Sequence, residues 1–199
     1  MAKKAKFVGF NFNPDFKLHK ACADDEYRPA FSYVYFRNGY AYATNAHIAV
    51  RAKVEDISNI APREIEALNG KAIHYKQFEL LLKHDSMEVS GNEIKMLNIG
   101  DNLTTTITLR DDIKFPDVDK VYEDAKAAFR ENPQTIDPCI NIALLNKLCA
   151  ALGNSNKKAG LRFCGLGKGI LVKFAENEYL DVIGLLMPMY GNPFEDLSN

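Results

Sequence analysis

The sequence lacks the features that would place the protein in a membrane or in an oxidising compartment. No run reaches the roughly 18 apolar residues that a membrane-spanning helix needs. The start, MAKKAKF, is basic but lacks the long apolar core of a signal peptide. No CxxC spacing occurs among the four cysteines, Cys22, Cys139, Cys149 and Cys164. We therefore expect a cytoplasmic protein with reduced, buried thiols and no membrane contact.

A strong charge of either sign is also lacking. The 199 residues include 25 Lys and Arg against 26 Asp and Glu, which gives a formal net charge of −1. Any contact with nucleic acid must therefore come from basic residues that cluster locally. The hydrophobic share of 47% is ordinary for a globular protein, and the length suffices for one or two compact domains.

No pattern indicates a catalytic, metal or cofactor site. The GLGKG string at 165–169 could suggest a phosphate loop, but it leads into the strand-like ILVKF and not into a helix, which favours a hairpin turn. The acidic runs at 24–26 and 111–112 have no histidine at ligand spacing and are interpreted as solvated turns. An enzyme would need perturbed acid-base residues in a cleft, which the sequence does not show. We expect no catalytic residues, no metal and no cofactor.

Turn signals and alternating patterns predict antiparallel strands. The Asn-Gly pair at 38–39, between two apolar runs, is a strong signal for a two-residue hairpin, and Gly-Asn at 91–92 predicts a second. The string NLTTTITL alternates in polarity. It predicts a strand with Leu103, Ile107 and Leu109 on one face and threonines on the other.

A short helix followed by strands occurs three times. Asn13 is the expected cap of the first helix, and Gly153 is expected to end the third. The apolar helix faces are Leu18, Ala21 and Cys22 in the first unit, Phe78, Leu81 and Leu82 in the second, and Leu145 and Leu148 in the third. A connector at 121–135 could form a short helix with one face made of Tyr122, Ala125 and Phe129. We predict an α+β protein with antiparallel sheets on one side and short helices on the other.

Lysines recur on the predicted helices. They are Lys17 and Lys20 in the first helix, Lys76 and Lys83 in the second, and Lys147 in the third, with Lys157 and Lys158 just beyond it. If three equivalent helices share one surface, these lysines would gather there and suit the phosphates of double-stranded DNA without reading its bases. Lysines on exposed helix faces more often serve only solubility, so the pattern alone leaves both interpretations open.

Three strings in the sequence, taken together and in order, resemble those of bacterial DNA sliding clamps. YAYATNAHIAV at 40–50 is similar to a clamp strand that ends in Ala-Thr-Asp-Gly-His. KFPDVDKV at 114–121 resembles the Phe-Pro-Asp-Tyr segment that closes a clamp domain, and LLMPMY at 185–190 resembles the C-terminal Met-Pro-Met ending. The resemblance covers most of the chain and implies the DNA-clamp-like fold of repeated helix-plus-strands units.

The resemblance also implies a domain organisation and a binding pocket. Residues 1–120 would form one full clamp-like domain, 121–135 a connector, and 136–199 half of a further domain. Clamp partners insert a short linear peptide into a pocket between adjoining domains. The implied peptide-binding pocket comprises Thr44, Ala46, His47, Ile48, Ala49, Pro116, Val121, Leu185, Met187, Pro188, Met189 and Tyr190. Methionine suits such a groove because its side chain is deformable and polarizable.

The chain departs from the clamp pattern at several pocket positions. Asn45 and Ala46 replace the Asp-Gly pair, while Ile48 and Tyr190 each stand where an arginine is usual. Two lost charges at the rim should change which peptides bind. The Met-Pro-Met strand could alternatively pack in the core.

The resemblance implies a non-enzymatic processivity factor of DNA replication or repair. It would tether a polymerase or another DNA-processing enzyme and contact duplex DNA non-specifically. The alternative is a peptide-binding adaptor that has the clamp fold but does not encircle DNA. A homo-oligomer is possible, because the third unit either completes a domain across a subunit interface or folds back on the first unit.

Overall fold

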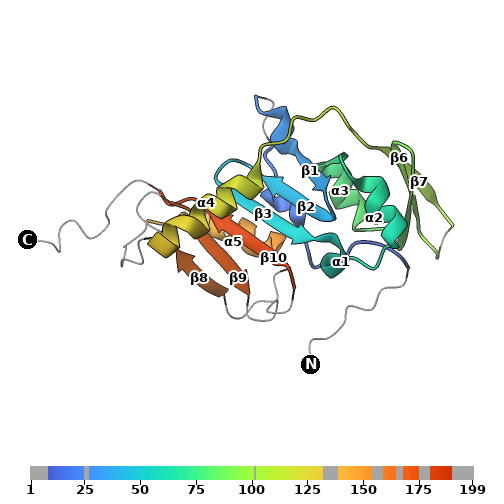
Figure 1. Ribbon diagram of the computed structural model, residues 1–199. Coiled ribbons are helices and arrows are strands. Elements are labelled where there is room, and N and C mark those ends of the chain that lie inside the picture. The colour runs from blue at the N-terminus through green and yellow to red at the C-terminus, as the bar shows by residue number, and fades with distance from the viewer. Residues whose placement is uncertain are drawn as a thin grey trace, which may run out of the picture.

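The structure is a computed structural model that describes residues 9–24, 27–100, 102–131, 139–153, 159–164, 168–174 and 180–189. Two antiparallel sheets and several short helices form the fold (Figure 1). The elements are η1 (Leu18–Ala21), η2 (Pro29–Ser32), β1 (Tyr33–Arg37), β2 (Tyr40–Thr44), β3 (Ile48–Lys53), α1 (Val54–Ile57), α2 (Pro62–Leu68), β4 (Ala72–His74), α3 (Tyr75–Leu81), β5 (Ser86–Ser90), β6 (Glu93–Leu97), β7 (Thr104–Thr108), α4 (Val118–Glu131), α5 (Ile142–Ala151), β8 (Ala159–Phe163), β9 (Ile170–Phe174) and β10 (Val182–Leu186). The predicted α+β class is confirmed.

The hairpins predicted at 38–39 and 91–92 are present, and β8 pairs antiparallel with β9 on either side of the third predicted turn, whose residues 165–167 lie outside the described residues. Asn38 and Gly39 join β1 to β2 with φ angles of 52° and 78°, the left-handed pair that a tight hairpin turn of this kind requires. Gly91, with φ of 58°, turns β5 into β6. The alternation in β7 is also confirmed in part, because Ile107 and Leu109 are buried. Leu103 is 60% exposed, since β7 begins one residue after it.

The seven-stranded sheet unites the first and third units. Its order is β4-β1-β2-β3-β10-β9-β8, and β5-β6-β7 form a separate three-stranded sheet. The junction lies where β10 pairs with β3, from Val182 opposite Ala52 to Leu186 opposite Ile48. The third unit therefore folds back on the first within one chain. The far edge of β8 has no strand beside it in the part of the chain described, and self-association stays a prediction, as do the domain boundaries.

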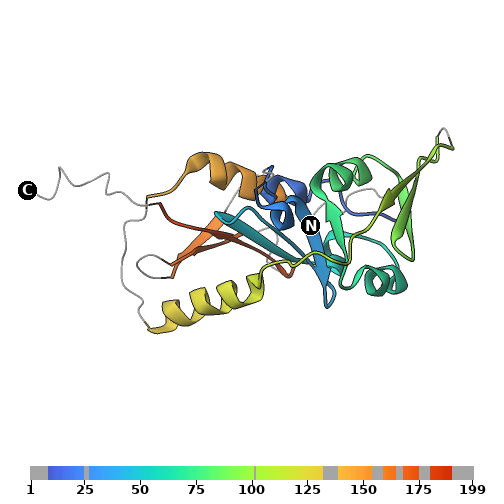
Figure 2. The same cartoon turned by 90° about the horizontal axis from the view of Figure 1, so that it is seen from above.

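The helices lie on both faces of the large sheet. Figure 2 shows α4 on one side and η1 and α5 on the other. On the second side η1 packs between α3 and α5, which forms a row of helices from all three units. Phe12, Leu18, Phe78, Leu81 and Leu148 fill the main core beneath this row.

The predicted cap of the first helix was wrong. Asn13 caps only a turn, because its Oδ1 accepts from the Asp15 N–H (2.9 Å), while the first helix is the single turn η1 that begins at Leu18. The short helix predicted within the connector is present as α4, which begins at Val118, three residues before the predicted start of the connector. Asp117 explains this earlier start, because its carboxylate accepts from the Lys120 N–H (3.3 Å) as an N-cap does.

Candidate functional site

The strings that resemble clamp motifs meet at the β3–β10 junction. The Met187 N–H donates to the His47 carbonyl (2.9 Å), which continues the pairing of Leu186 with Ile48 beyond the strand end. Two residues further along the chain, the Met189 N–H donates to the Cys139 carbonyl (2.9 Å). The β3 and β10 segments, whose paired residues are 130 to 140 positions apart in sequence, thus lie side by side.

The turn before β3 is held by its own polar side chains. Thr44 Oγ1 donates to the Ile48 carbonyl (2.7 Å) and accepts from the Ala46 N–H (3.1 Å). Asn45 Oδ1 accepts from the N–H groups of His47 and Ile48, both at 3.0 Å. A carboxylate would accept the same two hydrogen bonds, so Asn45 can replace the aspartate of the clamp pattern as their acceptor. Ala46 has φ of 73°, a conformation that favours glycine, which accounts for the usual Asp-Gly pair.

The start of α4 is fixed by one carboxylate that three neighbouring strands contact. Asp119 lies 2.7 Å from Arg37 Nη2 on β1 and 3.2 Å from Arg51 Nε on β3. The Tyr42 hydroxyl on β2 donates to it as well (2.8 Å). Burial, aided by the bond to Asp119, raises the pKa of Tyr42 to about 12, so the hydroxyl keeps its proton at neutral pH.

Tyr122, one turn further along α4 than Asp119, is buried between the helix and the sheet. It is 1% exposed, and its hydroxyl lies 2.9 Å from the carbonyls of both Ala49 and Ile183. Burial raises its pKa well above the ordinary value. Since the hydroxyl has one proton, it donates to one of the two carbonyls at a time. The ring packs among Ala49, Leu171 and Leu185 on the face of the sheet away from the main core.

The residues of the predicted pocket fall into two groups. Thr44, Ala49 and Leu185 are buried, and Ile48 is buried on the opposite face of the sheet, in the main core. The accessible residues are Ala46, His47, Val121 and Met189, together with the half-buried Pro116, Met187 and Pro188. Tyr190 lies outside the described residues.

The side of α4 on which Val121 lies follows from helix geometry. Residues two apart on a helix point about 200° apart, so Val121 lies on the flank opposite to Asp119. Asp119 contacts Arg37 and Arg51, which lie towards the Lys53 end of the sheet, and the opposite flank is the one towards Thr44 and Met187. Val121 is 44% exposed there. We call the surface formed by His47, Val121, Met187, Pro188 and Met189 the Met groove.

Five of the predicted lysines are exposed and lie on or beside the row of helices, while Lys157 and Lys158 lie outside the described residues. Lys20 lies in η1, Lys17 is the residue before it, and Lys147 lies in α5. Lys76 and Lys83 lie in and just after α3, where Lys83 Nζ is 3.8 Å from the Glu79 carboxylate. The positive charges of Lys17, Lys20 and Lys83 act on the buried His19. Burial mainly, and these lysines in addition, lower its pKa to about 4. We call the five lysines Lys17, Lys20, Lys76, Lys83 and Lys147 the lysine face.

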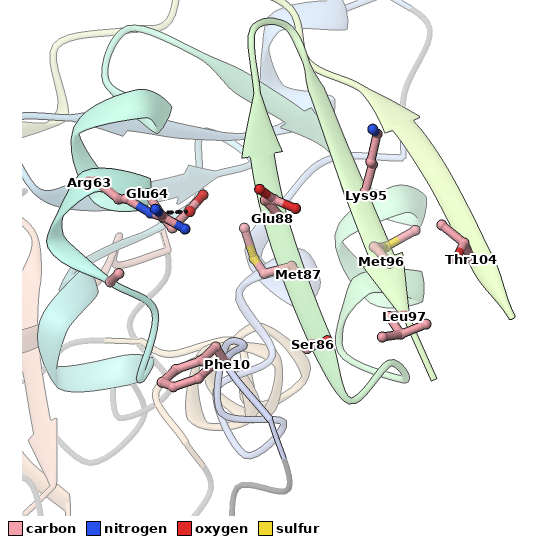
Figure 3. Close-up of a pocket in the computed structure, with 11 residues that line it drawn as sticks. Phe10, Arg63, Glu64, Ser86, Met87, Glu88, Lys95, Met96, Leu97 and Thr104 are labelled. Atoms are coloured by element: carbon pink, nitrogen blue, oxygen red, sulfur yellow. Dashed lines mark hydrogen bonds and ion pairs between the residues drawn. The ribbon is translucent and has the colours of Figure 1, made fainter. Parts of the chain in front are cut away.

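Sequence reasoning missed a groove of about 640 Å³ between α2 and the three-stranded sheet (Figure 3). Phe10, Met87, Met96 and Leu97 supply its apolar lining. Glu64 closes one side, since it accepts from the Val89 N–H at the edge of β5 (2.6 Å) and pairs with Arg63 (3.1 Å). This bond caps a strand edge that would otherwise be open. Two smaller cavities of about 360 and 280 Å³ lie elsewhere, and no predicted pocket residue lines any of the three.

The residues that the structure describes contain no group of three or more His, Cys, Asp or Glu side chains that could hold a metal ion. Among the helices described, none has the length and apolar character needed to cross a membrane.

Comparisons with known proteins give a match at the level of structure. No family model and no curated sequence matches the chain. Among solved structures, the DNA polymerase III beta subunit of Thermotoga maritima matches with a TM-score of 0.58 and 12% identity over 94% of this chain. The beta subunit of Caulobacter crescentus matches with 0.57 and 17% over 89%, and that of Pseudomonas aeruginosa with 0.55 and 13% over 96%. The match spans 65%, 64% and 69% of those three chains. The chain therefore has the fold of the bacterial DNA polymerase III beta subunits, the sliding-clamp fold.

Proposed function

We propose that the chain is a sliding-clamp-like accessory protein of DNA replication or repair, which tethers a polymerase or another DNA enzyme to duplex DNA. The observation that carries this proposal is the division of the clamp fold into two faces. The row η1, α3 and α5 lies on one face of the large sheet and α4 on the other (Figure 2). The row carries exposed lysines, and the Met groove lies beside α4. A protein of this design contacts DNA on one side and a partner on the other.

The lysine face supports contact with the phosphate backbone and no base reading. Lysine is a point charge on a flexible stem, which suits phosphates in many positions. Contact with DNA does not require a strongly basic protein. The net charge is −1, but the lysines are concentrated on neighbouring helices. Binding of this kind depends on the release of counterions and so on salt.

A salt titration with duplex DNA tests the first part of the proposal. If three to five lysines contact phosphates, affinity should fall roughly 40- to 500-fold between 50 and 200 mM salt, because each contact releases about one counterion. Fluorescence anisotropy with two duplexes of unrelated sequence would measure it, and both should give the same curve. Absence of binding at 50 mM salt, or a preference for one sequence, would contradict the proposal.

The Met groove supports docking of a short apolar segment of a polymerase or another DNA enzyme. Met187 is half-buried, and Met189 is 49% exposed. Flexible thioether side chains of this kind adapt to related apolar side chains. Val121 and His47, the other exposed members of this surface, add an apolar and a polar side chain.

Replacing Met187 by alanine tests the second part. We expect a peptide from a partner of the bacterial clamps to bind about tenfold more weakly, since a buried apolar contact of about 1.4 kcal/mol is lost. Leu103→Ala is the matched control, because it shortens an exposed apolar side chain outside the groove. Titration calorimetry gives the affinities and circular dichroism checks the fold. Equal binding by wild type and Met187→Ala would remove the Met groove from the proposal.

A further inference from the structure

The connector helix α4 covers part of the surface that the clamp resemblance assigns to a partner peptide. Val118, Tyr122 and Ala125 form its buried face, with exposures of 4%, 1% and 3%. They pack against Ala49 and Leu185, two of the predicted pocket residues. Small side chains at Ala49 and Ala125 leave the room that the ring of Tyr122 occupies.

The contacts of α4 with the sheet are of two kinds. Tyr122 fills an apolar site and its hydroxyl reaches the carbonyls of Ala49 and Ile183, which is what an anchoring side chain of a bound peptide would do. Asp119 fixes the first turn through Arg37, Arg51 and Tyr42. Two kinds of contact therefore hold the helix over the pocket. One is the buried ring of Tyr122, and the other is the set of polar contacts between Asp119 and Arg37, Arg51 and Tyr42, which we call the charged clasp.

The charged clasp is accessible to water, and this limits its strength. The side chains of Arg51, Arg37 and Asp119 are 21%, 35% and 38% exposed. Ion pairs in such positions contribute modestly, because solvent screens them. Arg51 keeps other partners if Asp119 leaves, since it lies 3.8 Å from Asp181 and over the ring of Tyr40. If the first turn of α4 detaches from the sheet, the Arg51 charge therefore still has Asp181 and the Tyr40 ring as partners.

From these contacts we infer that α4 is an internal occupant of the peptide pocket, which a partner peptide displaces to reach Ala49 and Leu185. The Met groove is the part that stays open when α4 is seated, and it offers the first point of contact. The inference rests on the proposed function and adds regulation of the same site. The apparent affinity of the peptide is lowered by the fraction of molecules in which α4 is seated.

Asp119→Asn tests this inference, with Glu123→Gln as its matched control. Each removes one carboxylate charge from α4, but Glu123 is exposed and pairs with Lys126 on the same helix. We expect Asp119→Asn to bind the partner peptide about threefold more tightly than wild type, since the seated state loses solvent-accessible ion pairs of modest strength. Glu123→Gln should bind as wild type does. Hydrogen exchange should show faster exchange of the α4 amides in wild type when the peptide is added.

The outcomes separate this inference from the proposed function. Equal or weaker binding by Asp119→Asn, with α4 amides still protected in the complex, would overturn the inference and leave the peptide pocket in place. If the peptide binds neither wild type nor either variant, the docking function itself fails, and the inference fails with it. Tighter binding together with faster α4 exchange supports both.

Discussion

Phe78→Ala is expected to lower the free energy of unfolding by about 3 to 5 kcal/mol, the usual cost of removing a buried phenyl ring. Phe78 has no exposed surface, and its ring lies 5.2 Å from that of Phe12 and 6.5 Å from that of His19. These contacts join α3 of the second unit to η1 of the first. The cavity left behind cannot close easily, because strands and helices surround it.

Leu80→Ala is the control on the same helix. Leu80 is 37% exposed, so its loss should cost less than about 1 kcal/mol. Urea unfolding followed by circular dichroism measures both variants, and their m values should agree with that of wild type. A cost below about 1.5 kcal/mol for Phe78→Ala would show that α3 and η1 are held together by other contacts.

The repeated units were predictable because local signals repeat in the sequence. Asn38-Gly39 fixes a hairpin turn by itself, and Asn141 caps α5 by accepting from the N–H groups of Ala143 and Leu144. The predicted faces of α3 and α5 are confirmed where Phe78 and Leu148 are buried. Such signals act over a few residues, and neighbouring residues are all that a periodic pattern can report.

The union of the first and third units was not predictable in the same way. Strands β3 and β10 are both apolar, and the sequence left open whether β10 pairs within the chain or across a subunit interface. The helices α1 and α2 were missed as well. For α2 a signal existed, because Pro62 stands at its first position and Ile65 and Leu68 follow at helical spacing.

The candidate site shows the same limit. The three clamp-like strings identified the segments that meet at the Met groove. They could not show that Tyr122 would cover Ala49, nor that Ile48 would face the main core. The contacts of Asp119 with Arg37, Arg51 and Tyr42 join residues 68 to 82 positions apart. No local pattern encodes such a network.

The last expected result concerns the lysine face. Lys76→Glu together with Lys83→Glu should weaken duplex DNA binding about 100-fold at low salt, since two attractions become two repulsions. Both residues are exposed, Lys76 in the first turn of α3 and Lys83 two residues after its end. The salt dependence should also become shallower, by a slope of about 2, because each lost lysine contact removes about one released counterion.

A matched pair on the other face makes this result specific. Lys114→Glu with Lys120→Glu changes the net charge by the same amount near the start of α4, and both residues are exposed. If general electrostatics governs binding, the two double variants should behave alike. If the lysine face contacts the phosphates, the second pair should lose less than about threefold, since charges beyond a Debye length are screened. Anisotropy with one duplex at several salt concentrations measures all three proteins. Equal loss in both double variants, or no loss in either, would show that α3 does not face the DNA.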